Sequence, residues 1–165
     1  MIDNSKIEAI VKKTIENLRS EEAGVIDDMT LELAKKISLK VRQKASEMGM
    51  RVVVAISNKA ARPVLVECMD DAFIASYDVA LNKAFTVVSL KMDTITLKPL
   101  AQPGESLYGI QFTNEGKIVI FGGGNVLKSG GKVIGGIGVS GGTEEQDTFL
   151  SAYGAGVFKD ELLKL

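Results

Sequence analysis

Residues 5–18 place apolar and charged positions with the period of an α-helix. At about 100° per residue, the apolar side chains gather on one side of the helix and most charged ones on the other. Ser5 and Glu8 have the spacing of a capping box at its start. The apolar side is formed by Ile7, Ile10, Val11, Thr14, Ile15 and Leu18. The pattern predicts an amphipathic helix within residues 1–19.

Beyond a charged linker at residues 20–28, the pattern becomes that of one domain, residues 29–165. Helical spacing predicts a second helix at 30–48 and a closing helix that begins at Thr143, where Gln146 completes a capping box. Runs rich in β-branched residues predict five strands. These strands are expected at residues 51–57, 63–69, 117–121, around 126–127 and at 132–139.

Short turns join neighbouring strands, and Ser129-Gly130-Gly131 has the composition of a hairpin turn. Hairpin connections make neighbouring strands antiparallel. We therefore predict an α+β domain with a five-stranded, mostly antiparallel sheet flanked by helices and preceded by the N-terminal amphipathic helix. Residues 93–116 contain prolines and turn residues, which predicts irregular chain with short helical pieces.

A third helix, predicted at residues 71–90, has two different sides. One is a large apolar stripe of Phe73, Tyr77, Leu81, Phe85 and Val88. The other carries mostly small or polar residues, namely Ala72, Ser76, Val79, Lys83, Thr86 and Leu90. A helix with two specialised sides is covered on both. We expect one side to belong to the core and the other to meet a subunit, a ligand or the edge of a pocket, which predicts a homo-oligomer.

Composition narrows the class of protein. The net charge of −1 argues against a general nucleic-acid binder. The single cysteine, Cys68, and the lack of a signal peptide or a long apolar run favour a cytoplasmic protein that does not span a membrane. Histidine is absent, which excludes a histidine base, a histidine-ligated haem and the common zinc sites within this sequence. We expect no metal site.

Ten of the 17 glycines lie between Phe121 and Thr143. The loop Gly122, Gly123, Gly124 and Asn125 is either a tight bend between strands or a pocket wall where backbone approaches a ligand. Residues 136–141 match GxGxxG, but only 22 residues follow Thr143, too few for the rest of a dinucleotide-binding fold. A weaker reading remains beside that of a structural turn. In it, backbone amides bind an anionic group at Ser140, Gly141 and Gly142.

Two ionisable residues stand out. Lys83 lies on the small-residue side of the third helix, where a charge needs a partner. It is either a ligand-binding cation or base, or a lysine at the domain rim or in an inter-subunit ion pair. Asp70 is either a ligand-binding group or the cap of the third helix. Thr86, one turn after Lys83, is the third ligand-binding candidate on this helix. No catalytic residue is assigned.

Three segments together resemble the GlcG/HbpS-like domain family, also called haem-degrading or DUF336 domains. They are Cys68–Ala72 running into Ala80–Thr86, the Gly122–Gly124 loop, and Gly135–Gly142 with Glu145-Gln146-Asp147. The resemblance covers residues 28–160 and implies an α+β fold, homo-oligomers and pockets near the glycine loops. It also implies haem or a corrinoid as the ligand, since some members resemble haem-binding proteins and others the C-terminal part of PduO-type adenosyltransferases. The family's proline after the glycine loop is missing, because Asn125-Val126 stands there.

Residues 1–22 with the linker also resemble the encapsulation peptides of bacterial microcompartment cargo enzymes, which dock on shell proteins. The alternative is a helix packed on its own domain or on a neighbouring subunit. We therefore expect an oligomeric domain that binds a small ligand or cofactor, in a microcompartment or a catabolic operon. The first alternative is an enzyme acting on a small anionic or carbonyl metabolite, with Lys83 as cation or base and glycine-loop amides as oxyanion donors. The second is an assembly factor without ligand.

Overall fold

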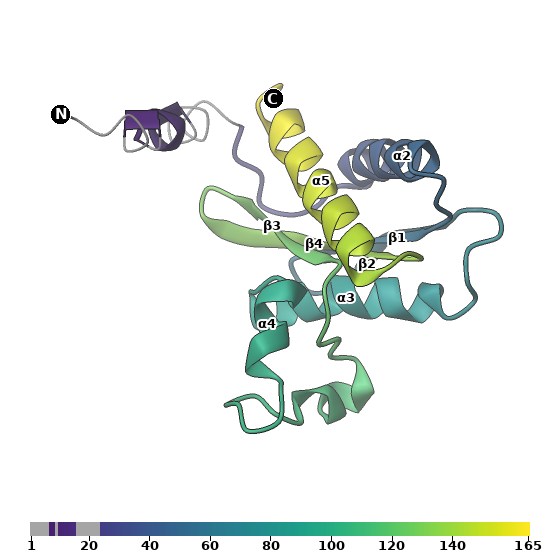
Figure 1. Ribbon diagram of the computed structural model, residues 1–165. Helices are drawn as coiled ribbons and strands as arrows, with labels where there is room; N and C mark the ends of the chain where they lie inside the picture. The colour runs from purple at the N-terminus through teal and green to yellow at the C-terminus, as the bar shows by residue number, and fades with distance from the viewer. Residues whose placement is uncertain (1–6, 9, 16–23) are drawn as a thin grey trace.

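The computed structural model describes residues 7–8, 10–15 and 24–165 (Figure 1). The domain contains four strands and four α-helices in the order α2-β1-β2-α3-α4-β3-β4-α5, with two short 3-10 helices, η1 and η2, between α4 and β3. The bounds are α2 Leu31–Glu47, β1 Val53–Asn58, β2 Pro63–Cys68, α3 Ser76–Leu90, α4 Thr94–Leu100, η1 Ile110–Phe112, η2 Asn114–Gly116, β3 Gly124–Ser129, β4 Lys132–Ser140 and α5 Glu144–Leu162.

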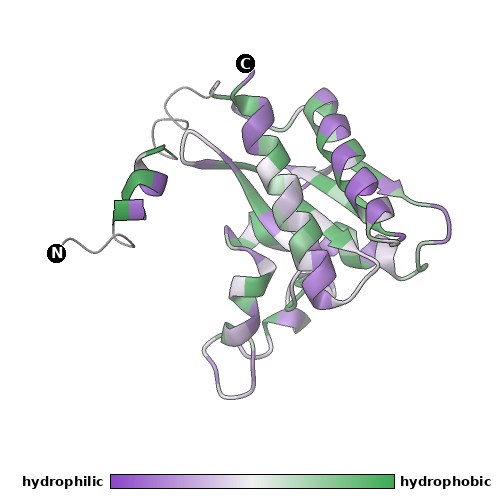
Figure 2. Ribbon diagram, turned by 45° about the horizontal axis from the view of Figure 1, so that its top comes forward, coloured by the Kyte–Doolittle hydropathy of each residue, from purple (hydrophilic) through white to green (hydrophobic). Residues whose placement is uncertain are grey.

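The strands form one antiparallel sheet in the order β2-β1-β4-β3. Helices α2 and α5 lie side by side on one face of the sheet, and α3 lies on the other (Figure 1). The larger core fills the layer under α2 and α5. Figure 2 shows the alternation of hydrophilic and hydrophobic positions along α2, as expected for a helix that covers one face of a sheet. The α+β class and the antiparallel sheet are confirmed.

The sheet has four strands, so the predicted fifth strand at residues 117–121 is wrong. Ile118 and Val119 are buried, and the backbone N–H of Val119 donates to the Thr86 hydroxyl of α3 at 3.0 Å. This segment is apolar because it packs beside a helix as irregular chain. A short apolar run does not distinguish that environment from a strand.

Helix α3 packs on the sheet through glycines. A Cβ built on Gly138 would lie 2.1 Å from the Ala80 carbonyl oxygen, and one on Gly136 would lie 2.4 Å from a methyl of Val87. Real Cβ atoms do not approach so closely, so only glycine at these two positions of β4 allows the helix to lie so near. The paired glycines of this strand are therefore explained by helix–sheet packing.

The more hydrophobic side of α3 is not the side that packs on the sheet. Three members of the small-residue side, Ser76, Lys83 and Thr86, are buried. Ala80 and Ala84 are buried as well and pack on β1. On the apolar stripe, Phe73 is 72% exposed and Tyr77 46% exposed, and only Val88 is buried. Close approach favours small side chains, so the more hydrophobic side is the one left outward.

The predicted starts of α2 and α5 are correct. Thr30 caps α2, and Thr143 with Gln146 forms the expected capping box of α5. Helix α3 begins at Ser76 and not at residue 71, because Asp71 has a left-handed backbone conformation, φ 66°. Its N-cap residue is Ala75, so Asp70 does not cap the helix.

Of the predicted N-terminal helix, residues 7–8 and 10–15 are described and are helical. Four apolar side chains of its stripe are exposed by 43–65%, namely Ile7, Ile10, Val11 and Ile15. Thr14 is exposed as well, while Leu18 lies outside the described residues. The full span of this helix and the linker at 20–28 remain predictions. No helix within the described residues is long and apolar enough to cross a membrane.

Candidate functional site

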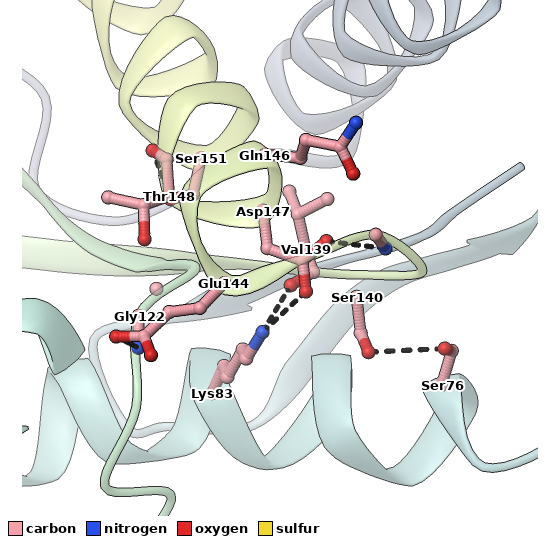
Figure 3. A network of polar contacts seen from close by, with 12 residues as sticks. Ser76, Lys83, Gly122, Val139, Ser140, Glu144, Gln146, Asp147, Thr148 and Ser151 are labelled. Atoms are coloured by element: carbon pink, nitrogen blue, oxygen red, sulfur yellow. Dashed lines mark hydrogen bonds and ion pairs between the residues drawn. The ribbon is translucent and has the colours of Figure 1, made fainter. Parts of the chain in front are cut away.

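The centre of the candidate site is an ion pair between α3 and α5 (Figure 3). Lys83 Nζ lies 2.9 Å from Asp147 Oδ2 and donates to the Val139 carbonyl oxygen of β4 at 2.8 Å. The Lys83 side chain is fully buried and that of Asp147 is 5% exposed. The ammonium group also lies 5.0 Å from the centre of the Phe121 ring, a cation–π distance. The pair therefore connects all three layers of the domain.

Burial perturbs both partners. It lowers the pKa of Lys83 and raises the pKa of Asp147, because each charged form loses its solvent. The opposite charge and the hydrogen bond between the two groups counter both shifts. Removing one partner of such a pair leaves the other charge buried without compensation, which typically costs about 3–5 kcal/mol.

The glycine loop covers this ion pair. Gly123 has a backbone φ of 108°, and a Cβ there would lie 2.5 Å from Lys83 Nζ and 2.8 Å from Asp147 Cβ. A Cβ on Gly122 would lie 2.1 Å from the Thr148 hydroxyl. Both glycines are therefore required by close packing. The atoms that approach the loop belong to this chain.

Carboxylates and a hydroxyl of the chain already occupy three of the backbone amides proposed as anion or oxyanion donors. The Gly122 N–H donates to Glu144 Oε1 at 3.2 Å, and the Gly142 N–H donates to Asp147 Oδ1 at 2.9 Å. The Gly124 N–H donates to the Thr94 hydroxyl at 2.9 Å. The helix N-terminus does attract anionic groups, as its dipole predicts, and these groups are Asp147 and Glu144.

Glu144 adds a second ion pair at the same end of α5. Its Oε2 lies 2.6 Å from Lys98 Nζ of α4, and both side chains are partly exposed. The hydrogen bond from Lys98 holds the pKa of Glu144 below its ordinary value. Close by, Thr148 Oγ1 is buried without a hydrogen-bond partner, one of two such side-chain atoms among the described residues.

Asn125 holds β3 to two helices. Its side-chain nitrogen donates to Asp93 Oδ2 at 3.0 Å, and its oxygen accepts from the Ser151 hydroxyl at 2.6 Å. The next residue, Val126, donates its backbone N–H to Asp93 Oδ1 at 2.7 Å. The family pattern has a proline at this position, and a proline has no N–H to donate. With valine at 126 the N–H is present, and Asp93 accepts its hydrogen bond.

The other predicted site residues contact groups of the chain itself or lie apart from the ion pair, and their binding of a ligand remains a prediction. The Thr86 hydroxyl binds the Asn82 carbonyl oxygen and the segment at 117–119. Ser140 Oγ lies 3.1 Å from Ser76 Oγ in a buried contact. Gly141 packs against the backbone of residues 51–52. Asp70 is exposed in the turn after β2, and no described hydrogen bond joins it to the others.

The structure therefore brings Lys83, Gly123 and Gly142 together around one group that sequence reasoning missed, Asp147. Asn125 lies apart from this group and bonds to Asp93 and Ser151. The sequence did contain a feature that points to Asp147, because Lys83 needs a counter-charge and Asp147 is an acid in the first turn of the closing helix. Glu144 is another acid in the same turn and could have been identified in the same way, whereas no sequence feature marked Asp93. In the structure Lys83 is buried and its ammonium group is paired with Asp147, and its role toward a ligand or substrate remains a prediction.

Ligands for a metal or a haem iron are sparse. Within the described residues, no group of three or more histidine, cysteine, aspartate or glutamate side chains could hold a metal ion. The thiol of Cys68 is exposed, and the phenol of Tyr77 belongs to a half-exposed side chain near the start of α3. The sequence of 165 residues has no histidine.

Three comparisons relate the chain to known proteins. A 15.0 kDa protein from the dhaT-dhaS intergenic region of Citrobacter freundii is 47% identical over 126 residues, which are 76% of this chain and 89% of that protein. The corrinoid adenosyltransferase PduO of Salmonella typhimurium is 40% identical over 64% of this chain, which spans only 31% of PduO. The solved PduOC:haem complex is 32% identical with a TM-score of 0.76, and it covers 79% of this chain and 94% of PduOC.

The family model described as haem degrading protein HbpS-like matches residues 29–155. This range contains the whole sheet, the Lys83–Asp147 ion pair and both glycine segments on which the resemblance was based. The chain belongs to the HbpS-like, DUF336 family, which is related to the C-terminal domain of PduO.

Proposed function

We propose that this protein is a subunit of a homo-oligomer that binds a small ligand or cofactor. The observation that supports this most strongly is the 32% identity to PduOC, whose solved structure is a haem complex. Sequence identity of this size over most of both chains favours a shared mode of use, although fold alone does not define function. The ligand class we propose is a tetrapyrrole, haem or corrinoid.

The donor set of this chain does not fit a haem held by histidine. The side chains that remain for iron are a thiol, thioethers and phenols, and among the described ones Cys68, Tyr77 and Tyr108 are exposed. Exposed apolar side chains, Phe73 at 72% and Ile74 at 96%, lie beside Tyr77 in sequence. A tetrapyrrole would therefore be held by apolar contact, with weak axial coordination at most.

A catalytic role through Lys83 has less support. The lysine is fully buried, and its ammonium group already contacts Asp147, the Val139 carbonyl oxygen and the Phe121 ring. The amides proposed as oxyanion donors bind Glu144 and Asp147. A substrate would have to displace internal carboxylates to reach them. We therefore favour binding over catalysis, and we keep an assembly factor without ligand as the other candidate.

Titration with hemin tests this proposal. We expect saturable binding with a broad Soret band, because no histidine supplies a strong axial ligand. A sharp low-spin spectrum at stoichiometric hemin would show that cysteine, methionine or tyrosine ligates iron strongly. Absence of any saturable change, with both hemin and a corrinoid, would contradict the tetrapyrrole class.

The proposed location is the interior of a bacterial microcompartment, in the cytoplasm, with a shell protein as partner of the N-terminal helix. The described part of that helix leaves Ile7, Ile10, Val11 and Ile15 exposed, as a docking helix requires before it binds. Fusion of residues 1–24 to a fluorescent protein should direct it to microcompartments. Replacing Ile10 and Val11 by aspartate should abolish this, because docking would desolvate the new charges.

A further inference from the structure

The two edge strands of the sheet, β3 and β2, differ in whether their outward backbone groups have hydrogen-bond partners. At the β3 edge, Asp93 accepts a hydrogen bond from the backbone N–H of Val126 at 2.7 Å, and Thr94 accepts one from Gly124 at 2.9 Å. The start of α4 therefore caps this edge. At the other edge, β2 pairs only with β1 among the described residues. An uncapped edge presents unpaired N–H and C=O groups to another chain.

The direction of these groups follows from the β1–β2 ladder. The Met69 N–H donates to the Val52 carbonyl oxygen at 3.0 Å, and Glu67 faces Val54 in the same register. Donors and acceptors alternate between the two sides of an antiparallel strand. The backbone groups of Val66 and Cys68 therefore point away from β1, toward the open edge.

Strand β2 has little of what usually protects an edge, because its one register shift, opposite Ile56 and Ser57, lies at its first residues. It contains no lysine, and its proline stands at the first position, Pro63. Its one charged side chain, Glu67, is held by the Ser38 hydroxyl at 2.5 Å and by Arg42 Nε at 2.7 Å. The interior residues, Val64, Leu65 and Val66, are only half-buried. A strand of this composition is suited to pairing with another strand.

We propose that the occupant of this edge is β2 of a second copy of the chain, paired antiparallel about a two-fold axis at Val66. A two-fold axis pairs the strand antiparallel with its own copy. The outward N–H groups of each strand then lie opposite outward C=O groups of the other. In this register the two Val66 residues exchange two hydrogen bonds, and the two sheets join into one of eight strands. This proposal rests on the homo-oligomer stated under the proposed function and names its interface.

Charge supports this register. Arg62 directly precedes β2 and Asp70 lies just after it, so antiparallel pairing centred on Val66 places Arg62 near Asp70 of the partner subunit. Both side chains are exposed, and they carry opposite charges. The symmetry repeats this contact at the other end of the pairing. Asp70, which stands apart from the candidate site, thereby acquires a partner.

Packing of α3 supports the same arrangement. The Lys83 and Thr86 side of this helix faces β4 and the segment at 117–119. The apolar stripe lies on another flank, where Tyr77 is 46% exposed and Leu81 and Phe85 are half-buried. A two-fold axis perpendicular to the joined sheet keeps both α3 helices on one face. Their apolar flanks would then lie toward each other and be covered.

Disulfide trapping tests the register. Paired residues of this type have Cα atoms about 5.5 Å apart, within the range of a disulfide. The variant Val66→Cys in a Cys68→Ser background should give a covalent dimer on mild oxidation. The native protein is the matched control, because its own exposed Cys68 would lie about 14 Å from Cys68 of the partner subunit, at about 3.4 Å per residue. It should remain uncrosslinked.

Charge reversal gives a second test at exposed positions, where folding should be unaffected. Arg62→Glu and Asp70→Arg should each raise the Kd of dimerisation at least about tenfold, since like charges meet twice per dimer. The double variant should restore it. Analytical ultracentrifugation gives the Kd, and circular dichroism verifies the fold of every variant.

The outcomes separate this proposal from the proposed function. Efficient crosslinking of the Val66→Cys variant together with rescue by the double reversal supports the β2 interface. An oligomer in which neither occurs overturns this interface and leaves the homo-oligomer standing. A native protein that stays at 17.6 kDa at micromolar concentration overturns both. Ligand binding is decided by the hemin titration in each case.

Discussion

Replacing Lys83 by methionine isolates the energetic role of the buried ion pair. Methionine keeps an unbranched side chain of similar length but removes the ammonium group that contacts Asp147 and the Val139 carbonyl oxygen. The carboxylate of Asp147 would remain buried, with one oxygen still accepting from the Gly142 N–H and the other unpaired. Loss of one partner from such a pair should cost about 3–5 kcal/mol. For a domain of this size, that corresponds to a melting temperature about 6–20 °C lower.

The cost should depend on pH with a definite sign. Burial already raises the pKa of Asp147, and Lys83 counters that shift, so its removal raises the pKa further. A carboxyl whose folded pKa lies above the unfolded value binds a proton more readily in the folded state. The variant should therefore be least stable relative to wild type near pH 7 and above. The difference should shrink as the pH falls toward the ordinary carboxyl pKa of 3.8.

Urea unfolding of wild type and Lys83→Met between pH 4 and 8 measures this. The control is the double variant Lys83→Met with Asp147→Asn, which has no buried charge. It should be more stable than the single variant at pH 7, with little extra pH dependence. The single variant could instead lose less than about 1 kcal/mol of unfolding free energy at pH 7, or the same amount at every pH. Either result would refute the view that the Lys83–Asp147 ion pair stabilises the domain.

Three further predictions concern other features. Gly138→Ala should cost about 1–3 kcal/mol or more, because its Cβ would lie 2.1 Å from the Ala80 carbonyl oxygen. Gly156→Ala is its control in α5, where nothing lies within 4 Å, and it should stabilise by up to about 1 kcal/mol; equal effects in chemical unfolding would contradict the packing argument. Asp93→Ala should leave the Val126 N–H without its acceptor and destabilise the domain by about 1–3 kcal/mol, with faster exchange of that amide by NMR. Deleting residues 1–24 should leave the melting temperature almost unchanged if the N-terminal helix serves only to dock on a shell protein. A loss of several kcal/mol of unfolding free energy, or loss of the oligomer, would show that the helix packs as part of the fold.

Sequence pattern predicted the secondary structure of this chain well where one signal was strong. Thr30 and Thr143 mark helix starts by their own hydroxyl groups, and Gly130 and Gly131 mark a turn that needs positive φ. The segment at 117–121 failed because burial and strand formation select the same apolar residues. Hydrophobicity also did not identify the buried side of α3, because glycines in another element made small residues the better packing surface.

The candidate site was only partly predictable for a related reason. Glycine density correctly located a place where atoms approach the backbone closely. It did not reveal whether those atoms belong to a ligand or to the chain, and in the structure they are Lys83, Asp147 and Thr148. Asp147 lies 64 positions after its partner Lys83. Such a long-range pairing has no period or local motif from which it can be inferred.

Native mass spectrometry of the protein purified from its own host shows whether it carries a small ligand. We expect a recurring bound mass in the tetrapyrrole range, together with masses that are multiples of 17.6 kDa. PduOC carrying its haem should be sprayed under identical conditions to show that such a ligand survives. Repeated preparations that contain only the bare polypeptide, while PduOC keeps its haem, would contradict the proposed function and favour an assembly factor.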